Sequence, residues 1–129
     1  MDNLLLMELD PVTKLYKGDL GSFSLKNDEY IKKFFYDGEY VNLYFDVDKD
    51  VEDWEYSAIY DVFPYDRFEG KGFIVSDIDD EYNPSWNVKI QYISDREKMQ
   101  ETFNELMDLI QDSIEFTFNE IKIRKDDYT

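Results

Sequence analysis

The sequence predicts an α+β fold, in which an antiparallel sheet of about five strands carries two short helices and packs against one long C-terminal helix. Three observations predict it. Short segments of alternating apolar and polar residues occupy the first three quarters of the chain, apolar residues recur at helical spacing in the last quarter, and no steady strand–helix alternation connects them. With 129 residues, we expect one domain spanning 1–129, with its last few residues frayed.

The N-terminal segment is expected to supply strands. Asn3–Leu9 is mostly apolar and is followed by the turn dipeptide Asp-Pro, which favours a buried first strand. Lys14–Tyr16 and Leu20–Leu25 are predicted as separate strands because Gly18 and Gly21 interrupt the pattern.

The next segment, Asp28–Tyr36, is predicted as a short helix. Asn27 is a suitable N-cap residue, and Ile31, Phe34 and Phe35 fall on one face at helical spacing. This prediction separates the N-terminal strands from the next strand along the chain.

The clearest strand is Tyr40–Val47, in which apolar and polar side chains alternate at every position. The segment after it, Val51–Phe63, fits a helical stripe and strand alternation equally well. We favour a helix because Asp48 or Asp50 is suited to cap it and acids fill its first turn, with Pro64 ending it.

The C-terminal half is expected to contain a hairpin and the long helix. Phe73–Ile78 and Trp86–Ile93 read as paired strands. Ser94–Glu97 has the S-x-x-E pattern of a capping box and opens a helix from Asp95 to about Lys125. One stripe of this helix is apolar and comprises Met99, Phe103, Leu106, Ile110, Ile114 and Ile121.

Most of that stripe is expected to be core. A helix of this length can extend beyond a small sheet, so Ile114, Phe118 and Ile121 are alternatively available to a second copy in a homodimer. Phe116 lies off the stripe and is expected to be exposed.

Composition excludes several functional classes. The absence of Cys excludes disulfides and thiolate metal sites, and the absence of His removes the commonest general base and metal ligand. No signal peptide or spanning segment is visible, so we expect a cytoplasmic protein. A net charge of −17 argues against direct contact with nucleic acids or anionic membranes.

The segment Asp46–Glu52 begins like a calcium-binding EF-hand loop, because D-x-D-x-D places alternate oxygens around one cation. The rest of the loop is missing: Val51 stands where Gly is needed, and Ser57 stands where a bidentate Glu is needed. We favour a solvated turn with no metal, and a weak Ca²⁺ or Mg²⁺ site remains an alternative.

Nothing in the sequence indicates an enzyme. No nucleophile elbow, P-loop or dinucleotide fingerprint is present, and no cofactor is implied. Among 31 Asp and Glu, some pair always lies at a glycosidase-like separation, so such a pair carries no information.

The strongest signal is a charge cluster. Residues 37–82 carry fifteen Asp and Glu against three Lys and Arg. Such self-repulsion destabilises a folded domain, so the cluster is expected to serve a purpose. Three interpretations are open: solubility, a docking face for a basic protein, or a mimic of a nucleic-acid backbone.

We favour the mimic, a non-enzymatic inhibitor that occupies the basic DNA or RNA site of a partner, because alternate acids on an extended strand repeat at about 6.6 Å. In size and charge the chain is similar to the small acidic inhibitors that phages use against restriction and CRISPR enzymes. The alternative is a structural or interaction domain, possibly homodimeric. The expected contact residues are Asp46, Asp48, Asp50, Glu52, Asp53 and Glu55, then Asp77, Asp79, Asp80 and Glu81, with Tyr44, Tyr56 and Tyr82 as aromatic anchors.

Overall fold

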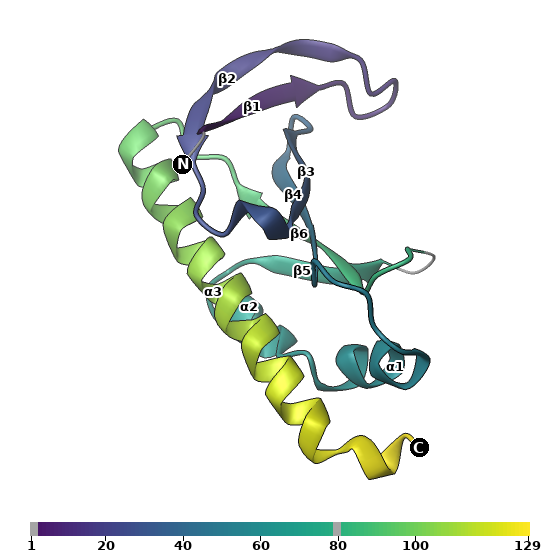
Figure 1. Ribbon diagram of the computed structural model, residues 1–129. Coiled ribbons are helices and arrows are strands. Elements are labelled where there is room, and N and C mark those ends of the chain that lie inside the picture. The colour runs from purple at the N-terminus through teal and green to yellow at the C-terminus, as the bar shows by residue number, and fades with distance from the viewer. Residues whose placement is uncertain (1–2, 79–80) are drawn as a thin grey trace.

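The structure, a computed structural model, describes residues 3–78 and 81–129. Within these residues the chain forms a six-stranded, mostly antiparallel sheet and three α-helices (Figure 1). The strands are β1 (Asn3–Leu9), β2 (Tyr16–Ser24), β3 (Ile31–Tyr36), β4 (Tyr40–Asp46), β5 (Ile74–Ile78) and β6 (Ser85–Gln91). The helices are α1 (Asp53–Val62), α2 (Tyr65–Glu69) and α3 (Arg96–Ile123), and the 3-10 turns are η1 (Asp28–Tyr30) and η2 (Lys125–Asp127). The α+β prediction is therefore confirmed, with one strand more than expected.

The strand order is β2-β1-β3-β4-β6-β5. Every neighbouring pair is antiparallel except β1 and β3, which are parallel. The predicted hairpin is confirmed as β5 and β6, with Val75 opposite Val88. β4 lies near the centre of the sheet, and both of its edges are paired.

The segment predicted as a helix over Asp28–Tyr36 is instead one short 3-10 turn followed by β3. Asn27 makes no side-chain cap and adopts a left-handed backbone conformation. Ile31 and Phe34 satisfy both helical and strand spacing, and the sheet decides between them. β3 fills the gap between β1 and β4, where both of its edges gain backbone hydrogen bonds.

β2 is one continuous strand, so the prediction of two strands separated at Gly18 and Gly21 is wrong. The glycines are accommodated within the strand, with a register shift against β1 between Leu5 and Met7. Gly21 has a φ of 107°, and a Cβ there would lie 2.9 Å from the Arg96 guanidinium. The positive φ favours glycine at that position, whereas the Arg96 guanidinium is the end of a flexible side chain that can move.

α3 runs along one face of the sheet and supplies much of the core (Figure 1). Its apolar stripe is buried, including Ile114 and Ile121, whose exposed fractions are 3% and 1%. The core interpretation is confirmed for both residues, and neither is free to contact a second copy. Phe118 is partly buried, and Phe116 is 37% exposed beneath the Arg67 guanidinium, whose carbon lies 4.5 Å from the ring centre.

An aromatic cluster on the same face joins α1 and α2 to the sheet. The Phe63 ring stacks on Trp86 at a centroid distance of 4.2 Å, and Phe45 stacks on the same indole at 5.3 Å. Phe68 is fully buried beside them. Tyr65 accepts a hydrogen bond from the Trp86 indole N–H at 3.1 Å, so the buried donor is satisfied.

Two helix starts differ in detail from prediction. α1 is confirmed as a helix, but its N-cap is Glu52 and not Asp48 or Asp50. α3 is capped by Asp95, whose carboxylate accepts hydrogen bonds from the backbone N–H groups of Glu97 and Lys98, so the predicted cap at the preceding serine is wrong. The Asp95 carboxylate, placed one residue after Ser94, reaches the N–H groups of the N2 and N3 residues. None of the helices described has the length and apolarity needed to cross a bilayer.

Candidate protein-binding surface

The D-x-D segment after β4 forms a turn and not an extended row. Asp46 Oδ1 accepts the backbone N–H of Asp48 at 2.7 Å, and Asp48 has a left-handed φ of 56°. Lys32 Nζ lies 3.6 Å from Asp46 Oδ1 and 3.3 Å from Asp48 Oδ1. A lysine of the same chain therefore neutralises part of this pair, and the expected 6.6 Å repeat of carboxylates is absent here.

The next acids serve the start of α1. Glu52 and Glu55 form a reciprocal capping box, in which Glu55 Oε1 accepts the Glu52 N–H at 2.9 Å. Glu52 Oε2 also accepts the Trp54 indole N–H at 2.6 Å. Asp53 adds a carboxylate to the positive end of the helix dipole. These carboxylates are thus held in place by the helix that they stabilise, while Glu52 and Asp53 remain exposed.

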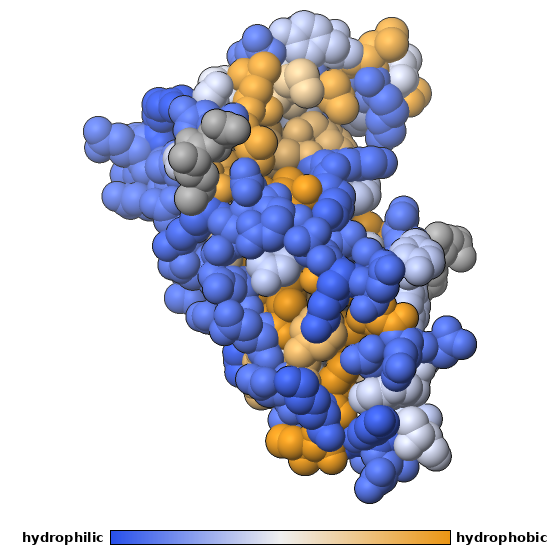
Figure 2. Space-filling view, in the orientation of Figure 1, coloured by the Kyte–Doolittle hydropathy of each residue, from blue (hydrophilic) through white to orange (hydrophobic). Residues whose placement is uncertain are grey.

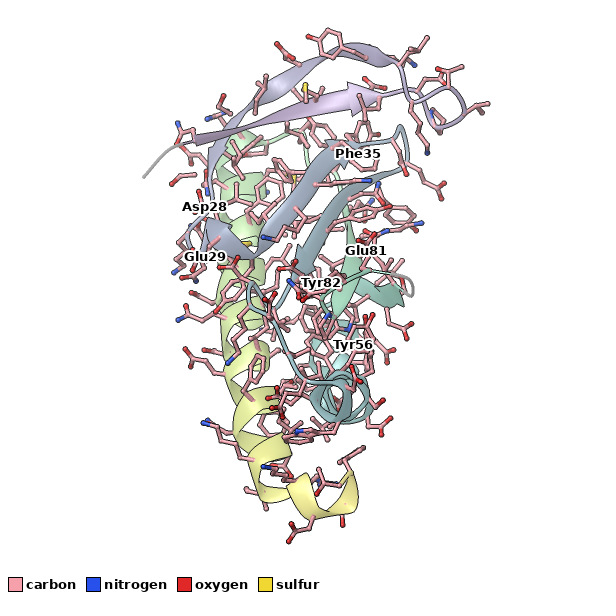
Figure 3. All side chains as sticks on the ribbon, turned by 45° about the vertical axis from the view of Figure 1, so that its right-hand side comes forward. Asp28, Glu29, Phe35, Tyr56, Glu81 and Tyr82 are labelled. Atoms are coloured by element: carbon pink, nitrogen blue, oxygen red, sulfur yellow. The ribbon has the colours of Figure 1, made fainter. Side chains whose placement is uncertain are left out.

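Two tyrosines of α1 tie the helix to the loop after β5. Tyr56 Oη donates to the backbone carbonyl of Glu81 at 2.8 Å, which joins two groups that the sequence placed in one site (Figure 3). Tyr60 Oη donates to Ile78 O at 3.0 Å and accepts the Ser85 N–H at 2.9 Å. Figure 3 shows Tyr56 on α1 below Tyr82 and Glu81 of this loop.

We name the exposed or partly exposed acids gathered here the acidic surface. It comprises Asp50, Glu52, Asp53, Glu55 and Glu81. Tyr82, 79% exposed, stands beside it as an aromatic anchor of the kind interfaces favour. Asp79 and Asp80, also predicted as contacts, lie outside the described residues.

Two predicted contacts lie elsewhere on the sheet. Asp77 pairs with Trp86 in the register and faces the helical side, near Tyr65. Tyr44 lies on the opposite face, where it shares a small cavity of about 100 Å³ with Asp46, Glu81, Lys32 and Lys33 and with Phe45, Ile78 and Ser85. The acids are therefore not a single two-row array, because Asp77 lies on the helical side and lysines line the cavity that Asp46 and Glu81 share on the other side.

Sequence reasoning missed a second acidic feature, which we name the acidic groove. It has a volume of about 570 Å³ and lies between η1, the β4–α1 loop and α3. Three carboxylates line it: Glu29, Asp48 and Glu115. They are far apart in the sequence, and Glu29 was assigned to a helix, so no sequence pattern connected them. Figure 3 shows Asp28 and Glu29 at the η1 turn, close to the course of α3.

The negative charges of the groove act on the tyrosine that lines it, Tyr30. The pKa of Tyr30 is raised by burial and by the negative charges of Glu29, Glu115 and Asp48. Lys49 Nζ lies 3.9 Å from the centre of the Phe118 ring on the groove wall. The chain's own Lys49 therefore occupies this ring, and the carboxylates of the groove are the groups suited to attract lysine or arginine side chains of another protein.

The residues that the structure describes contain no group of three or more carboxylates placed to hold a metal ion. The acids instead accept hydrogen bonds from helix N–H groups, pair with lysines, or face solvent. Chemically, the arrangement is suited to bind cationic side chains.

No curated protein and no solved structure matches the chain significantly. One family model does, and it covers residues 1–129. The chain therefore belongs to the family described as "Family of unknown function (DUF6762)".

Proposed function

We propose that the protein is a non-enzymatic binding protein whose acidic surface and acidic groove occupy the basic nucleic-acid-binding site of a partner protein. The observation that carries the proposal is the juxtaposition of Glu29, Asp48 and Glu115 in one groove. Of these, Asp48 lies close along the chain to the acids at the start of α1. Proteins that bind nucleic acids do so largely through lysine and arginine contacts to phosphates, and carboxylates complement the same side chains.

Rigidity supports this proposal. A charged surface binds with less entropic cost when its backbone is already ordered. Here the capping box at Glu52 and Glu55 orders the helix start, and the hydrogen bond from Tyr56 to the Glu81 carbonyl ties the loop to α1. The carboxylates are therefore presented by a fixed scaffold and not by a disordered acidic tail.

Net charge supports the mode of association. A charge of −17 steers a basic partner to the surface at low ionic strength, and salt weakens that attraction. Mimicry of DNA or RNA adds a further requirement, which is that the nucleic acid and this protein compete for one site. Inhibition of a nuclease of the restriction or CRISPR type is the specific form of this proposal.

The experiment is affinity capture at low salt from a lysate of the source organism, with partners eluted by a salt gradient and identified by mass spectrometry. We expect a basic nucleic-acid-binding protein that is displaced by DNA or RNA and by moderate salt. The test variant reverses four exposed acids of the acidic groove and the acidic surface whose side chains form no hydrogen bond or ion pair with the described residues: Glu29→Lys, Asp50→Lys, Asp53→Lys and Glu81→Lys.

A matched control reverses the same number of charges on α3 and η2. It carries Glu101→Lys, Asp112→Lys, Asp126→Lys and Asp127→Lys. The test variant is expected to lose the partner and the control to retain it. Equal loss of partner capture in both variants would show that the interaction depends only on net charge. Unchanged capture by the test variant would refute the proposed surface.

A further inference from the structure

The sheet has a second face that no described helix covers. α3, α1 and α2 pack on the face of β4 that carries Leu43 and Phe45, and α3 passes behind β3 and β4 in Figure 3. The strand register shows which residues lie on the other face of the sheet, which we name the open face. On β1, β3, β4, β6 and β5 they are Leu5, Met7, Leu9, Lys33, Phe35, Tyr40, Asn42, Tyr44, Asn87, Lys89, Gln91, Ile74, Ser76 and Ile78.

None of those positions is acidic. The open face also carries Asp19 of β2, which lies opposite Met7 and accepts a hydrogen bond from Tyr16 Oη at 2.7 Å. Asp46 ends the same row on β4, where it is paired with Lys32. The open face therefore carries few acids, in contrast to the acidic surface, and its lysines are Lys33 and Lys89.

A groove of about 420 Å³ lies on this face, and its lining is largely apolar. Met7, Leu9, Phe35 and Tyr44 contribute to its lining, together with Lys14 and Lys33. Phe35 and Tyr44 contact each other at a ring-centroid distance of 6.1 Å. Lys33 Nζ lies 5.3 Å from the centre of the Tyr44 ring.

The groove continues into exposed apolar residues. Leu5 and Met7 on β1 are 42% and 36% exposed, and Val12 and Leu15 at the tip of the β1–β2 hairpin are 86% and 68% exposed. Figure 2 shows apolar side chains gathered at the end of the molecule formed by β1 and β2. An apolar patch of this kind on an otherwise charged domain marks an interaction site.

The lysines of the groove identify the chemistry of its occupant. Four lysines, Lys17, Lys26, Lys32 and Lys71, lie within 4.0 Å of a carboxylate, and among the described residues the other seven lysines do not. Within the described residues, Lys14 and Lys33 have no carboxylate at that distance. Two unneutralised ammonium groups beside an apolar floor complement a ligand that brings both carboxylates and apolar side chains.

We propose that this groove binds a short acidic peptide segment of a partner protein, with its apolar side chains on Met7 and Phe35 and its carboxylates paired with Lys14 and Lys33. A short segment brings only a few negative charges toward a chain of net charge −17, whereas a second copy brings another −17. The groove also extends to Lys14 of the β1–β2 hairpin, which suits a peptide laid across it.

The test is a selection of random 12-residue peptides displayed on phage, with the folded full-length protein as bait. A second bait, Met7→Gln with Lys33→Glu, removes peptides that bind elsewhere. We expect the enriched peptides to combine Asp or Glu with Leu, Ile, Phe or Trp, and amide NMR shifts on binding to map to β1, β3 and β4.

The charge contribution is measured with Lys14→Glu and Lys33→Glu together, against a control with Lys98→Glu and Lys122→Glu on α3. The groove variant is expected to bind a selected synthetic peptide about tenfold more weakly, and the control to bind it unchanged. Circular dichroism confirms that both variants are folded.

Four outcomes would overturn the proposal. These are no enrichment over the second bait, enriched peptides that are basic or neutral, NMR shifts confined to another surface, and a dimer in sedimentation that Met7→Gln abolishes. The last result would assign the face to a second copy. None of these outcomes depends on the acidic surface, so the peptide-binding proposal can fail without affecting the proposed function.

Discussion

The two faces of β4 have the same backbone and the same alternation, yet they differ in almost every physical property. Phe45 on one face is fully buried between Trp86 and Phe68, whereas its neighbour Tyr44 on the other face is half-buried beneath Lys33. The difference comes from coverage, because helices pack on one face only. Strand alternation therefore assigns residues to two faces, but the packing of helices decides which face becomes the core.

The largest expected effect on stability comes from replacing Phe45 and Tyr44, one at a time, by alanine. Phe45→Ala is expected to lower the free energy of unfolding by about 3–5 kcal/mol, because it leaves a cavity in the aromatic cluster. Tyr44→Ala is expected to lower it by about 1 kcal/mol, since only part of its ring is removed from water. Urea unfolding measures both variants, and similar losses would show that the open face is packed as tightly as the core.

A second test concerns how α1 is held against the covered face. Tyr60→Phe leaves the Ser85 N–H and the Ile78 carbonyl without their hydroxyl partner, and we expect a loss of about 1–3 kcal/mol. Tyr56→Phe removes one exposed hydrogen bond to Glu81 and is expected to cost about 0.5–1 kcal/mol. Thermal unfolding should rank the two variants in this order, and the reverse order would contradict the assigned roles.

A third test locates the start of the helix that covers the core face. Asp95→Ala is expected to cost about 1 kcal/mol, because the backbone N–H groups of Glu97 and Lys98 lose their acceptor. Ser94→Ala is expected to change stability by less than about 0.5 kcal/mol. A larger loss for Ser94→Ala would restore the cap predicted by the S-x-x-E pattern.

The smallest expected effect concerns pH at the edge of the open face. Burial acts to raise the pKa of Asp37, but hydrogen bonds from the N–H groups of Tyr40 and Glu39 and from Asn42 Nδ2 outweigh it and lower the pKa. A lowered folded-state pKa means that the carboxylate contributes stability above its unfolded value of about 3.9 and that this stability disappears as pH falls through the folded value.

We therefore expect Asp37→Asn to be less stable than the original chain at neutral pH, and the difference between them to shrink in acid. Urea midpoints for both proteins, measured from neutral pH to below about pH 3, check this. Comparing the two proteins at each pH removes the general relief of self-repulsion as the other carboxylates are protonated. A difference that stays constant across this range would show that the carboxylate charge of Asp37 contributes nothing.

The elements with one clear periodicity were predictable from sequence. β4 and β6 show strand alternation at every position, and α3 carries an apolar stripe over many turns. The segment 28–36 was not predictable from sequence, because Ile31 and Phe34 fit both helical and strand spacing. The backbone partners that favour a strand come from β1 and β4. In this segment, pairing with neighbouring strands and not local helix propensity determined the structure.

The residues of the candidate site were likewise predictable only in part. The acids at the start of α1 were found because they are adjacent in sequence, and they remain together in the structure. Glu29 and Glu115 were missed because η1 and α3 bring them together from distant parts of the chain. The lysine that neutralises Asp46 and Asp48 was also invisible, since Lys32 reaches them across the β3–β4 pair.

The sequence by itself determined the α+β class, the long C-terminal helix, the strand alternation of the central sheet and the acidity of the middle of the chain. These depend on local periodicity and composition, which act between residues close in sequence. Only the tertiary structure decided which acids share a groove, which are paired with lysine, and which face of the sheet remains uncovered. Those features depend on contacts between distant segments, because side chains many residues apart meet only when the sheet and helices pack.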